Sequence, residues 1–201
     1  MRQPAKLAAM EAHFHTEESA SLIIGGIPDE EAKEVNYAIK IPGALSFLAH
    51  GDFDAEVIGL DQFPEEHHPP VAVVHYAFQI MVGLGMLLVG LSLMYFVSLW
   101  KKENWQFQRW FLWLFVLATP LGFIALEAGW TVTEVGRQPW IIYEIMLTKD
   151  AVTPIPGIRY SFFIFSAIYV SLAGIVSFLL YRQIKAVPQT LKQNSLGSTD
   201  S

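Results

Sequence analysis

The protein has 201 residues, of which 53% are hydrophobic, and its mean hydropathy is +0.37. Soluble domains hold about 45–50% apolar residues. Here the excess is gathered into three blocks, so the composition predicts an integral membrane protein with a water-facing part. The net charge of −6 and the lack of a basic patch argue against nucleic acid as a partner. Because the chain contains no cysteine, disulfides and thiolate metal sites are excluded.

Residues 1–70 are predicted to form a polar, partly helical extramembrane segment. Pro4 suits the first turn of a helix, where its missing N–H costs nothing. Leu7, Met10 and Phe14 follow at a spacing that gives a helix one apolar face. The pattern therefore predicts an amphipathic helix at the start of the chain.

Residues 19–70 are acidic and are expected to be irregular, with a turn signal at Gly25-Gly26. His67-His68 lie beside acidic residues, which is compatible with a metal site. Adjacent histidines do not share a helix face, however, and Pro69-Pro70 favour an extended chain. An extended connection without a metal is therefore the favoured interpretation.

Three apolar runs are long enough to cross about 30 Å of hydrocarbon as helices. They cover residues 71–100, 110–133 and 160–182, within a transmembrane region of residues 71–185. Pro120 predicts a kink in the second helix. Residues 186–201 are predicted to be a polar tail without regular structure. The predicted fold class is an all-α integral membrane protein with three transmembrane helices.

Basic residues near the ends of the helices predict the orientation, because short cytoplasmic loops are enriched in Lys and Arg. They gather in the loop of residues 100–109 and in the C-terminal tail, as Lys101, Lys102, Arg109, Arg182, Lys185 and Lys192. The tail is therefore expected in the cytoplasm and the N-terminal segment outside. Three basic residues in the outer loop run against this rule, namely Arg137, Lys149 and Arg159.

Met81 lies about 15 Å into the first predicted span at helical rise. A buried methionine usually only fills space, but a thioether is also a soft ligand that favours ferrous haem iron. His75 is six residues earlier and does not share a helix face with Met81. Because His75 is close to the start of the span, it is expected to be hydrated at the membrane interface.

Glu127 and Glu134 are two helical turns apart and are predicted to face one side of the second span. Carboxylates at membrane depth need a partner, a metal or a proton, so a haem ligand or a proton path is indicated. Arg137 is one turn beyond Glu134 and suits either that carboxylate or an anionic group such as a haem propionate. A water-exposed ion pair is equally compatible, and Trp130 and Trp140 also fit an aromatic belt.

Three blocks of sequence together resemble subunit I of the cytochrome bd quinol oxidases. Residues 3–11 read Gln-Pro-Ala-Lys-Leu-Ala-Ala-Met-Glu, which is similar to the start of the quinol-binding loop of that family. Residues 78–85 read Phe-Gln-Ile-Met-Val-Gly-Leu-Gly, like the helix with its Met ligand. Residues 136–140 read Gly-Arg-Gln-Pro-Trp, preceded by Gly129-Trp130 and Glu134. The resemblance covers essentially the whole chain, but only the C-terminal half of the family's subunit.

In that family a quinol is oxidised near the outer face and oxygen is reduced to water, which contributes to the proton gradient. The resemblance implies that Lys6 and Glu11 belong to the quinol site, with Glu11 as the proton acceptor. It also implies that Met81 ligates a low-spin haem b and Glu134 a high-spin haem b. The oxygen site would hold haem d or a third haem b.

The same resemblance assigns three further residues of the second span and its end. Arg137 would neutralise haem propionates, Trp130 would pack near the haems, and Glu127 is a candidate for a proton path. The implied partners are the N-terminal part of subunit I and subunit II, and the implied location is the bacterial cytoplasmic membrane. The sequence departs from many members at Gln79, where they carry Arg two residues before the Met ligand.

The family's earlier spans, which supply the His ligands, have no counterpart in this sequence. Met81 therefore has no trans ligand within the chain, and the chain alone is expected to bind haem weakly and to be inactive. A rival interpretation is a three-span assembly or interaction protein, or an inactive fragment, in which Glu134 and Arg137 are paired interfacial charges. A proton or ion carrier would rest on Glu127 and Glu134 alone.

Overall fold

The computed structural model describes residues 3–101, 107–152 and 157–197, with side chains up to Lys185. The chain divides into two compact units, Met1–Val152 and Thr153–Ser201. The boundary predicted from the sequence after residue 70 separates the extramembrane segment from the transmembrane region and lies within the first unit. The structure keeps the extramembrane segment and the first two membrane helices in one unit because the first helix of the chain packs against the first span.

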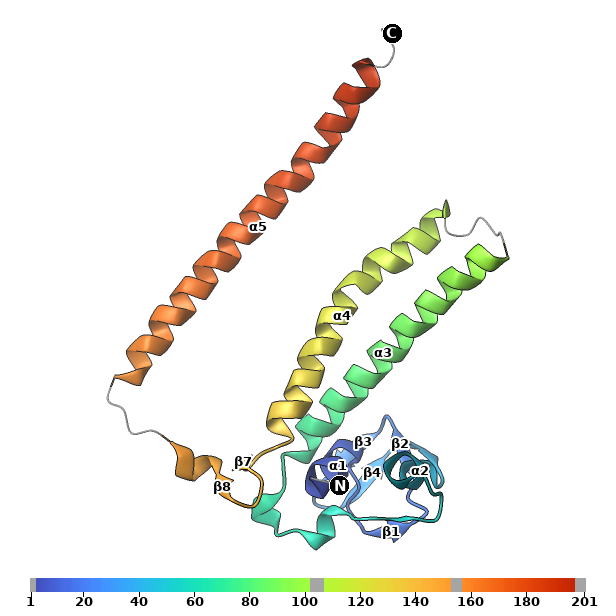
Figure 1. Ribbon diagram of the computed structural model, residues 1–201, viewed down its shortest axis with the longest axis vertical. Coiled ribbons are helices and arrows are strands. Elements are labelled where there is room, and N and C mark those ends of the chain that lie inside the picture. Colours follow the sequence, from blue (N-terminus) through green and yellow to red (C-terminus); the bar gives the residue numbers. More distant parts are fainter. Residues whose placement is uncertain (1–2, 102–106, 153–156, 198–201) are drawn as a thin grey trace. The chain divides into compact units, whose positions relative to one another are not determined.

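Three helices are long and apolar enough to cross a membrane, which confirms the predicted fold class. They are α3 (Val71–Trp100), α4 (Arg109–Val135) and α5, whose apolar part is Ile158–Lys185. Figure 1 shows α3 and α4 running side by side in opposite directions, and α4 continues through Pro120.

Helix α5 extends over Ile158–Gly197, so the expectation that the tail lacks regular structure is wrong as far as Gly197. Residues 189–193 read Gln-Thr-Leu-Lys-Gln, and four of these five residues are good helix formers. Polarity alone therefore did not predict disorder here, because the helical preference of the residues continues past the membrane span.

The extramembrane segment begins with α1 (Pro4–Glu11), as the proline at its first position predicts. Three antiparallel strand pairs follow and are nested: β1 with β6 encloses β2 with β5, which encloses β3 with β4. The bounds of the elements in this part are β1 Glu17–Glu18, β2 Leu22–Ile24, β3 Ile27–Asp29, β4 Glu34–Asn36, β5 Ile39–Ile41, α2 Ala44–His50, β6 Glu56–Val57, η1 Leu60–Gln62 and η2 Glu65–His67. Strands of two or three residues are too short to show the alternation that reveals a strand in a sequence.

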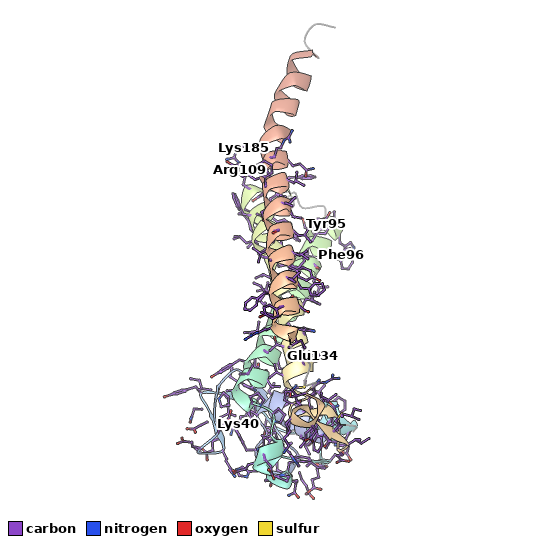
Figure 2. The ribbon with its side chains drawn as sticks, turned by 90° about the vertical axis from the view of Figure 1, so that its left-hand side faces the viewer. Lys40, Tyr95, Phe96, Arg109, Glu134 and Lys185 are labelled. Carbon is purple, nitrogen blue, oxygen red and sulfur yellow. The ribbon has the colours of Figure 1, made fainter. Side chains whose placement is uncertain are left out.

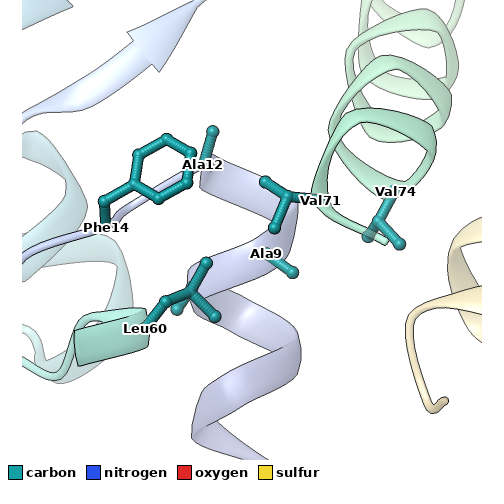
Figure 3. Close-up of a cluster of buried hydrophobic side chains, with 7 residues drawn as sticks. Ala9, Ala12, Phe14, Leu60, Val71 and Val74 are labelled. Atoms are coloured by element: carbon teal, nitrogen blue, oxygen red, sulfur yellow. The ribbon is translucent and has the colours of Figure 1, made fainter. Parts of the chain in front are cut away.

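The buried residues of α1 are Ala5, Ala8, Ala9 and Glu11. Of the apolar residues predicted to form one face, Phe14 and Met10 pack with Ala8 and Ala9, and Leu7 packs against a second cluster. Ala8 and Ala9 are fully buried, whereas Leu7 and Met10 are only partly buried and Phe14 lies beyond the helix end. Figure 3 shows α1 packed against the first turn of α3 in a cluster that consists of Ala8, Ala9, Ala12, Phe14, Leu60, Val71 and Val74. Small side chains let the two helix backbones approach closely.

Helix α3 has two parts with different surroundings. At 30 residues it is about 45 Å long, which exceeds the roughly 30 Å of hydrocarbon that it has to cross. Its buried residues Val71, Val74, His75 and Ala77 all lie in the first two turns, and Ser98 is the other buried residue of α3. We call residues 71–79 the base of α3, which the extramembrane segment covers, and residues 80–100 its shaft.

After α4, a short hairpin pairs β7 (Trp140–Ile142) with β8 (Met146–Leu147), and η4 (Thr148–Ala151) follows. The hairpin belongs to the same unit as the extramembrane segment. Its first strand begins at Trp140, which is the last residue of the Gly-Arg-Gln-Pro-Trp block at the end of α4.

Candidate functional site

Two of the three sequence blocks that carry the family resemblance lie against each other. A Cβ atom added to Gly136, at the end of α4, would lie 3.3 Å from Cε of Lys6 in α1. Partial burial lowers the pKa of Lys6, and the positive charge of Arg137 lowers it further, while Glu134 acts in the opposite direction. Glycine at position 136 thus makes room for the lysine side chain, although 130 residues of sequence separate the two.

Glu134 and Arg137 form an ion pair, with 3.7 Å between Oε2 of Glu134 and Nη1 of Arg137. Their side chains are 45% and 41% exposed, so the pair contributes little to stability. Figure 2 shows Glu134 at the end of α4 that adjoins the extramembrane segment. This carboxylate is one of the two partners considered for Arg137 from the sequence.

A narrow crevice joins α1, η2 and the residues that follow α4. Its lining includes Gln3, Lys6, His67, Arg137, Trp140 and Tyr143. The rings of His67 and Trp140 are tilted against each other with 4.9 Å between their centroids. The crevice therefore brings the start of the chain, His67 and the block at residues 136–140 to one place.

Glu11, at the C-terminal end of α1, is 3% exposed, and its Oε2 atom has no hydrogen-bond partner among the described residues. Burial raises the pKa of Glu11 to about 7, and the backbone amide of Ile23 offsets only part of this effect. A carboxyl group poised near neutral pH is suited to accept and release a proton. Lys6 lies beside Gly136, whereas the carboxyl group of Glu11 faces the backbone amide of Ile23 in β2.

His75 and Gln79 are functional candidates that the sequence analysis did not identify as a pair. His75 is fully buried, so the expectation of a hydrated interfacial side chain is wrong. Its Nδ1 lies 2.9 Å from the carbonyl oxygen of Met10, and its Nε2 lies 3.4 Å from that of Gly25. Gln79 Nε2 donates to the Ile23 carbonyl at 2.8 Å, and its Oε1 accepts from the Gly25 amide at 3.1 Å. The sequence pattern that could have identified them is two polar residues one turn apart in an otherwise apolar helix.

Met81 follows Gln79 by two residues and is partly buried at the start of the shaft of α3. A Cβ atom added to Gly129 of α4 would lie 2.9 Å from its sulfur atom. The two remaining candidates on α4, Trp130 and Glu127, are exposed, Trp130 to 64%. The structure thus brings Met81 to the Gly129-Trp130 dipeptide of the third block.

The metal hypothesis for His67-His68 finds no support in the part of the chain that the structure describes. Within it no group of three or more His, Cys, Asp or Glu side chains is arranged to hold a metal ion. His68 instead bonds through Nε2 to the carbonyl oxygens of Leu60 and Phe63, at 3.0 and 2.9 Å. Histidine here fixes the backbone around η1.

Comparison with known proteins gives consistent results over almost the full chain. The model of the family described as "Cytochrome bd terminal oxidase subunit I" matches residues 1–188. The putative cytochrome bd menaquinol oxidase subunit I of Bacillus subtilis (strain 168) is 43% identical over 182 residues, which is 89% of this chain and 40% of that protein. The cytochrome bd ubiquinol oxidase subunit 1 of the same organism is 30% identical over 198 residues, covering 91% and 42%.

A solved structure agrees with these sequence matches. The bd oxidase from Geobacillus thermodenitrificans has 39% sequence identity and a TM-score of 0.78, over 91% of this chain and 42% of that chain. The chain thus spans about 40% of the length of the curated relatives that it matches. The resemblance seen in the sequence is confirmed, and the chain belongs to the cytochrome bd terminal oxidase subunit I family.

Proposed function

We propose that this chain forms the C-terminal part of subunit I of a bd-type quinol oxidase, which oxidises a membrane quinol and reduces oxygen to water. The observation that carries the proposal is the packing of Lys6 against Gly136, which joins the first and third sequence blocks in one site. The relatives named above are described as menaquinol and ubiquinol oxidase subunits, which supports a quinol as the substrate.

In this proposal the extramembrane segment takes up the protons that quinol oxidation releases. A quinol loses two electrons and two protons when it becomes a quinone. Glu11, buried and with a pKa near 7, accepts a proton from a quinol hydroxyl group. The ammonium group of Lys6 orients a quinol oxygen by donating a hydrogen bond to it.

The donor atoms that α3 and α4 offer are of types that bind haem iron, and in this proposal they would hold the haems. Met81 offers a thioether, held against Gly129 and partly exposed, for a low-spin haem b. Glu134 offers a half-exposed carboxylate for a high-spin haem b, and Arg137 would then turn from Glu134 to a propionate. The haems, including haem d or a third haem b, would supply electron transfer from quinol to oxygen. Trp130 would pack near them, and Glu127 would serve a proton path.

The remaining part of the oxidase would come from outside this sequence. The partners in this proposal are the N-terminal part of subunit I, subunit II and the lipid bilayer of a bacterial cytoplasmic membrane. The extramembrane segment would lie outside, and the C-terminal part of α5 would end in the cytoplasm. The basic residues Lys101, Lys102 and Arg109 between α3 and α4 support that orientation.

The proposal is tested by replacing Met81 with leucine in the oxidase complex that contains this chain. The expected result is loss of the low-spin haem band in the reduced-minus-oxidised spectrum, because leucine offers no ligand atom. Met86→Leu is the matched control, since Met86 lies on the same helix and is 68% exposed. An unchanged band in Met81→Leu would refute the ligand assignment, and a complex without any haem would favour the rival assembly protein.

A further inference from the structure

Two polar side chains of the α3 base reach into the extramembrane segment. His75 and Gln79 are four residues apart, so they lie on one face of the helix, one turn above the other. Each of them bonds to the backbone of a segment more than 50 residues away in the sequence. Through these bonds the two side chains fix the position of the extramembrane backbone relative to α3.

His75 fixes the end of α1. The last carbonyl groups of a helix have no partner within the helix. Those of Ala8 and Ala9 accept from the amides of His13 and Ala12, whereas that of Met10 faces His75 Nδ1 at 2.9 Å. Both ring nitrogens face carbonyl oxygens, and an N–H group at Nδ1 makes the shorter of the two contacts a hydrogen bond to Met10. The peptide that leads into Glu11 is thereby held by α3.

Gln79 fixes the end of β2 and the turn that follows. Its amide group donates to Ile23 and accepts from Gly25, and only one orientation of the amide satisfies both bonds. Gly25 has a φ of +69°, a conformation that glycine adopts without strain. Gln79 thus stabilises one conformation of a turn whose glycine residues could adopt several.

Both of the held segments border Glu11. Met10 precedes it in the chain, and the backbone amide of Ile23 faces its carboxyl group. We propose that His75 and Gln79 are positioning residues, a clamp on α3 that holds the Glu11 carboxyl in place for proton transfer from quinol. The clamp also ties this carboxyl to the helix that carries Met81. This inference rests on the proposed function and adds two residues and a connection to it.

The chemistry of Gln79 makes the clamp specific to this residue. An arginine at this position would have donors and no acceptor. It can replace the bond to the Ile23 carbonyl but not the bond from the Gly25 amide. Gln79→Arg is therefore a half-clamp variant, whereas Gln79→Leu removes both bonds.

The test measures quinol-dependent oxygen uptake by the complete oxidase, with the dithionite-reduced haem spectrum as a check of haem content. For His75→Leu and Gln79→Leu we expect kcat to fall by about tenfold or more, because a displaced general base loses efficiency. KM should change by less than about threefold, since neither side chain is proposed to bind quinol. The spectrum with dithionite, which does not need the quinol site, should remain that of the unmodified oxidase.

Rescue by shape-matched variants separates positioning from general folding. The amide nitrogen of asparagine can occupy the place of Nδ1 and donate to Met10, so His75→Asn should keep kcat near the unmodified value. His75→Gln places its amide at the position of Nε2 and should not rescue. His68→Leu is the matched control, because His68 also bonds to backbone carbonyls of this segment, those of Leu60 and Phe63, but to neither of the two segments that His75 and Gln79 hold. Its kcat should stay within about twofold.

The outcomes distinguish the two proposals. Unchanged kcat in both leucine variants, equal losses in His68→Leu, or a rise in KM alone would overturn the clamp while leaving the oxidase function intact. If His75→Leu does not assemble, the comparison of His75→Asn with His75→Gln decides in its place, and equal kcat in these two overturns the assignment of the bond to Met10. An unmodified complex without quinol-dependent oxygen uptake would overturn the proposed function and the clamp with it.

Discussion

The extramembrane segment with the base of α3 differs from the shaft of α3 and from α4 in how deeply its polar side chains are buried. Ser46 is fully buried, accepts from the Ala20 amide at 2.8 Å and donates to the Ala55 carbonyl at 2.7 Å. His75 likewise bonds within the chain. In the shaft of α3 and in α4, Met81 and Glu134 are only partly buried, and large apolar side chains such as Leu117 are exposed. Under the proposed function, the groups of the quinol side are held by contacts within this chain, and the partly exposed haem ligands would be covered by groups from outside it.

The largest expected effect comes from Glu11→Gln, which keeps the size of the side chain but removes its ability to accept a proton. Quinol-dependent oxygen uptake should fall by about 100-fold or more, the usual loss when a general base is removed. Glu66→Gln, on an exposed side chain of the same segment, is the control. Activity of Glu11→Gln within a few-fold of the unmodified oxidase would mean that another group takes the proton.

The burial of Glu11 also predicts how stability depends on pH. Its pKa is about 7 in the folded chain against 4.5 as the ordinary value, so the protonated carboxyl favours the fold. That contribution is complete below pH 4.5 and is lost as the pH rises to about 7, by about 3 kcal/mol. Thermal unfolding in detergent at pH 5 and pH 8 should show this loss, and Glu11→Gln should lack it. Parallel pH profiles for both proteins would contradict the burial of an unpartnered carboxyl.

Ser46 and Ser92 give a smaller contrast between the two regions. Ser46→Ala leaves a buried amide and a partly buried carbonyl without a partner and should destabilise the extramembrane segment by about 1–3 kcal/mol. Ser92, in the shaft of α3, is exposed and donates to the Leu88 carbonyl of its own helix, so Ser92→Ala should stay within about 0.5 kcal/mol. Chemical denaturation in detergent measures both, and equal effects would remove the distinction between the regions.

The smallest expected effect concerns the contact between the shaft of α3 and helix α4. Gly129→Ala places a methyl group 2.9 Å from the Met81 sulfur, which the flexible side chain can avoid by moving. The low-spin haem band of the oxidase should shift while haem content is retained. Gly122→Ala is the control, because an added Cβ there meets no atom within 4 Å. A shift of the haem band in Gly122→Ala, or no shift in Gly129→Ala, would contradict the assignment of Met81 as a ligand of the low-spin haem.

The features predicted well from the sequence are those with a local signal. The apolar run of α3 and the proline at the start of α1 are of this kind. The first of the three sequence blocks that resemble the family also identified Lys6 and Glu11 as candidate site residues. The alanine face of α1, the burial of His75 and the nested strand pairs depend on contacts between distant segments. No pattern within one element reports such contacts, and alanine in particular carries no hydrophobic periodicity of its own.

The most direct test of the difference between the two regions is hydrogen–deuterium exchange at the Gly25 amide, in this chain alone and in the assembled oxidase. This amide donates to Gln79 Oε1, so its protection reports whether the α3 base and the extramembrane segment are joined. We predict protection of about tenfold or more over the unfolded rate in both samples, abolished by Gln79→Leu. Exchange at the unfolded rate in the chain alone, with protection only in the oxidase, would show that the quinol side also depends on groups outside this chain.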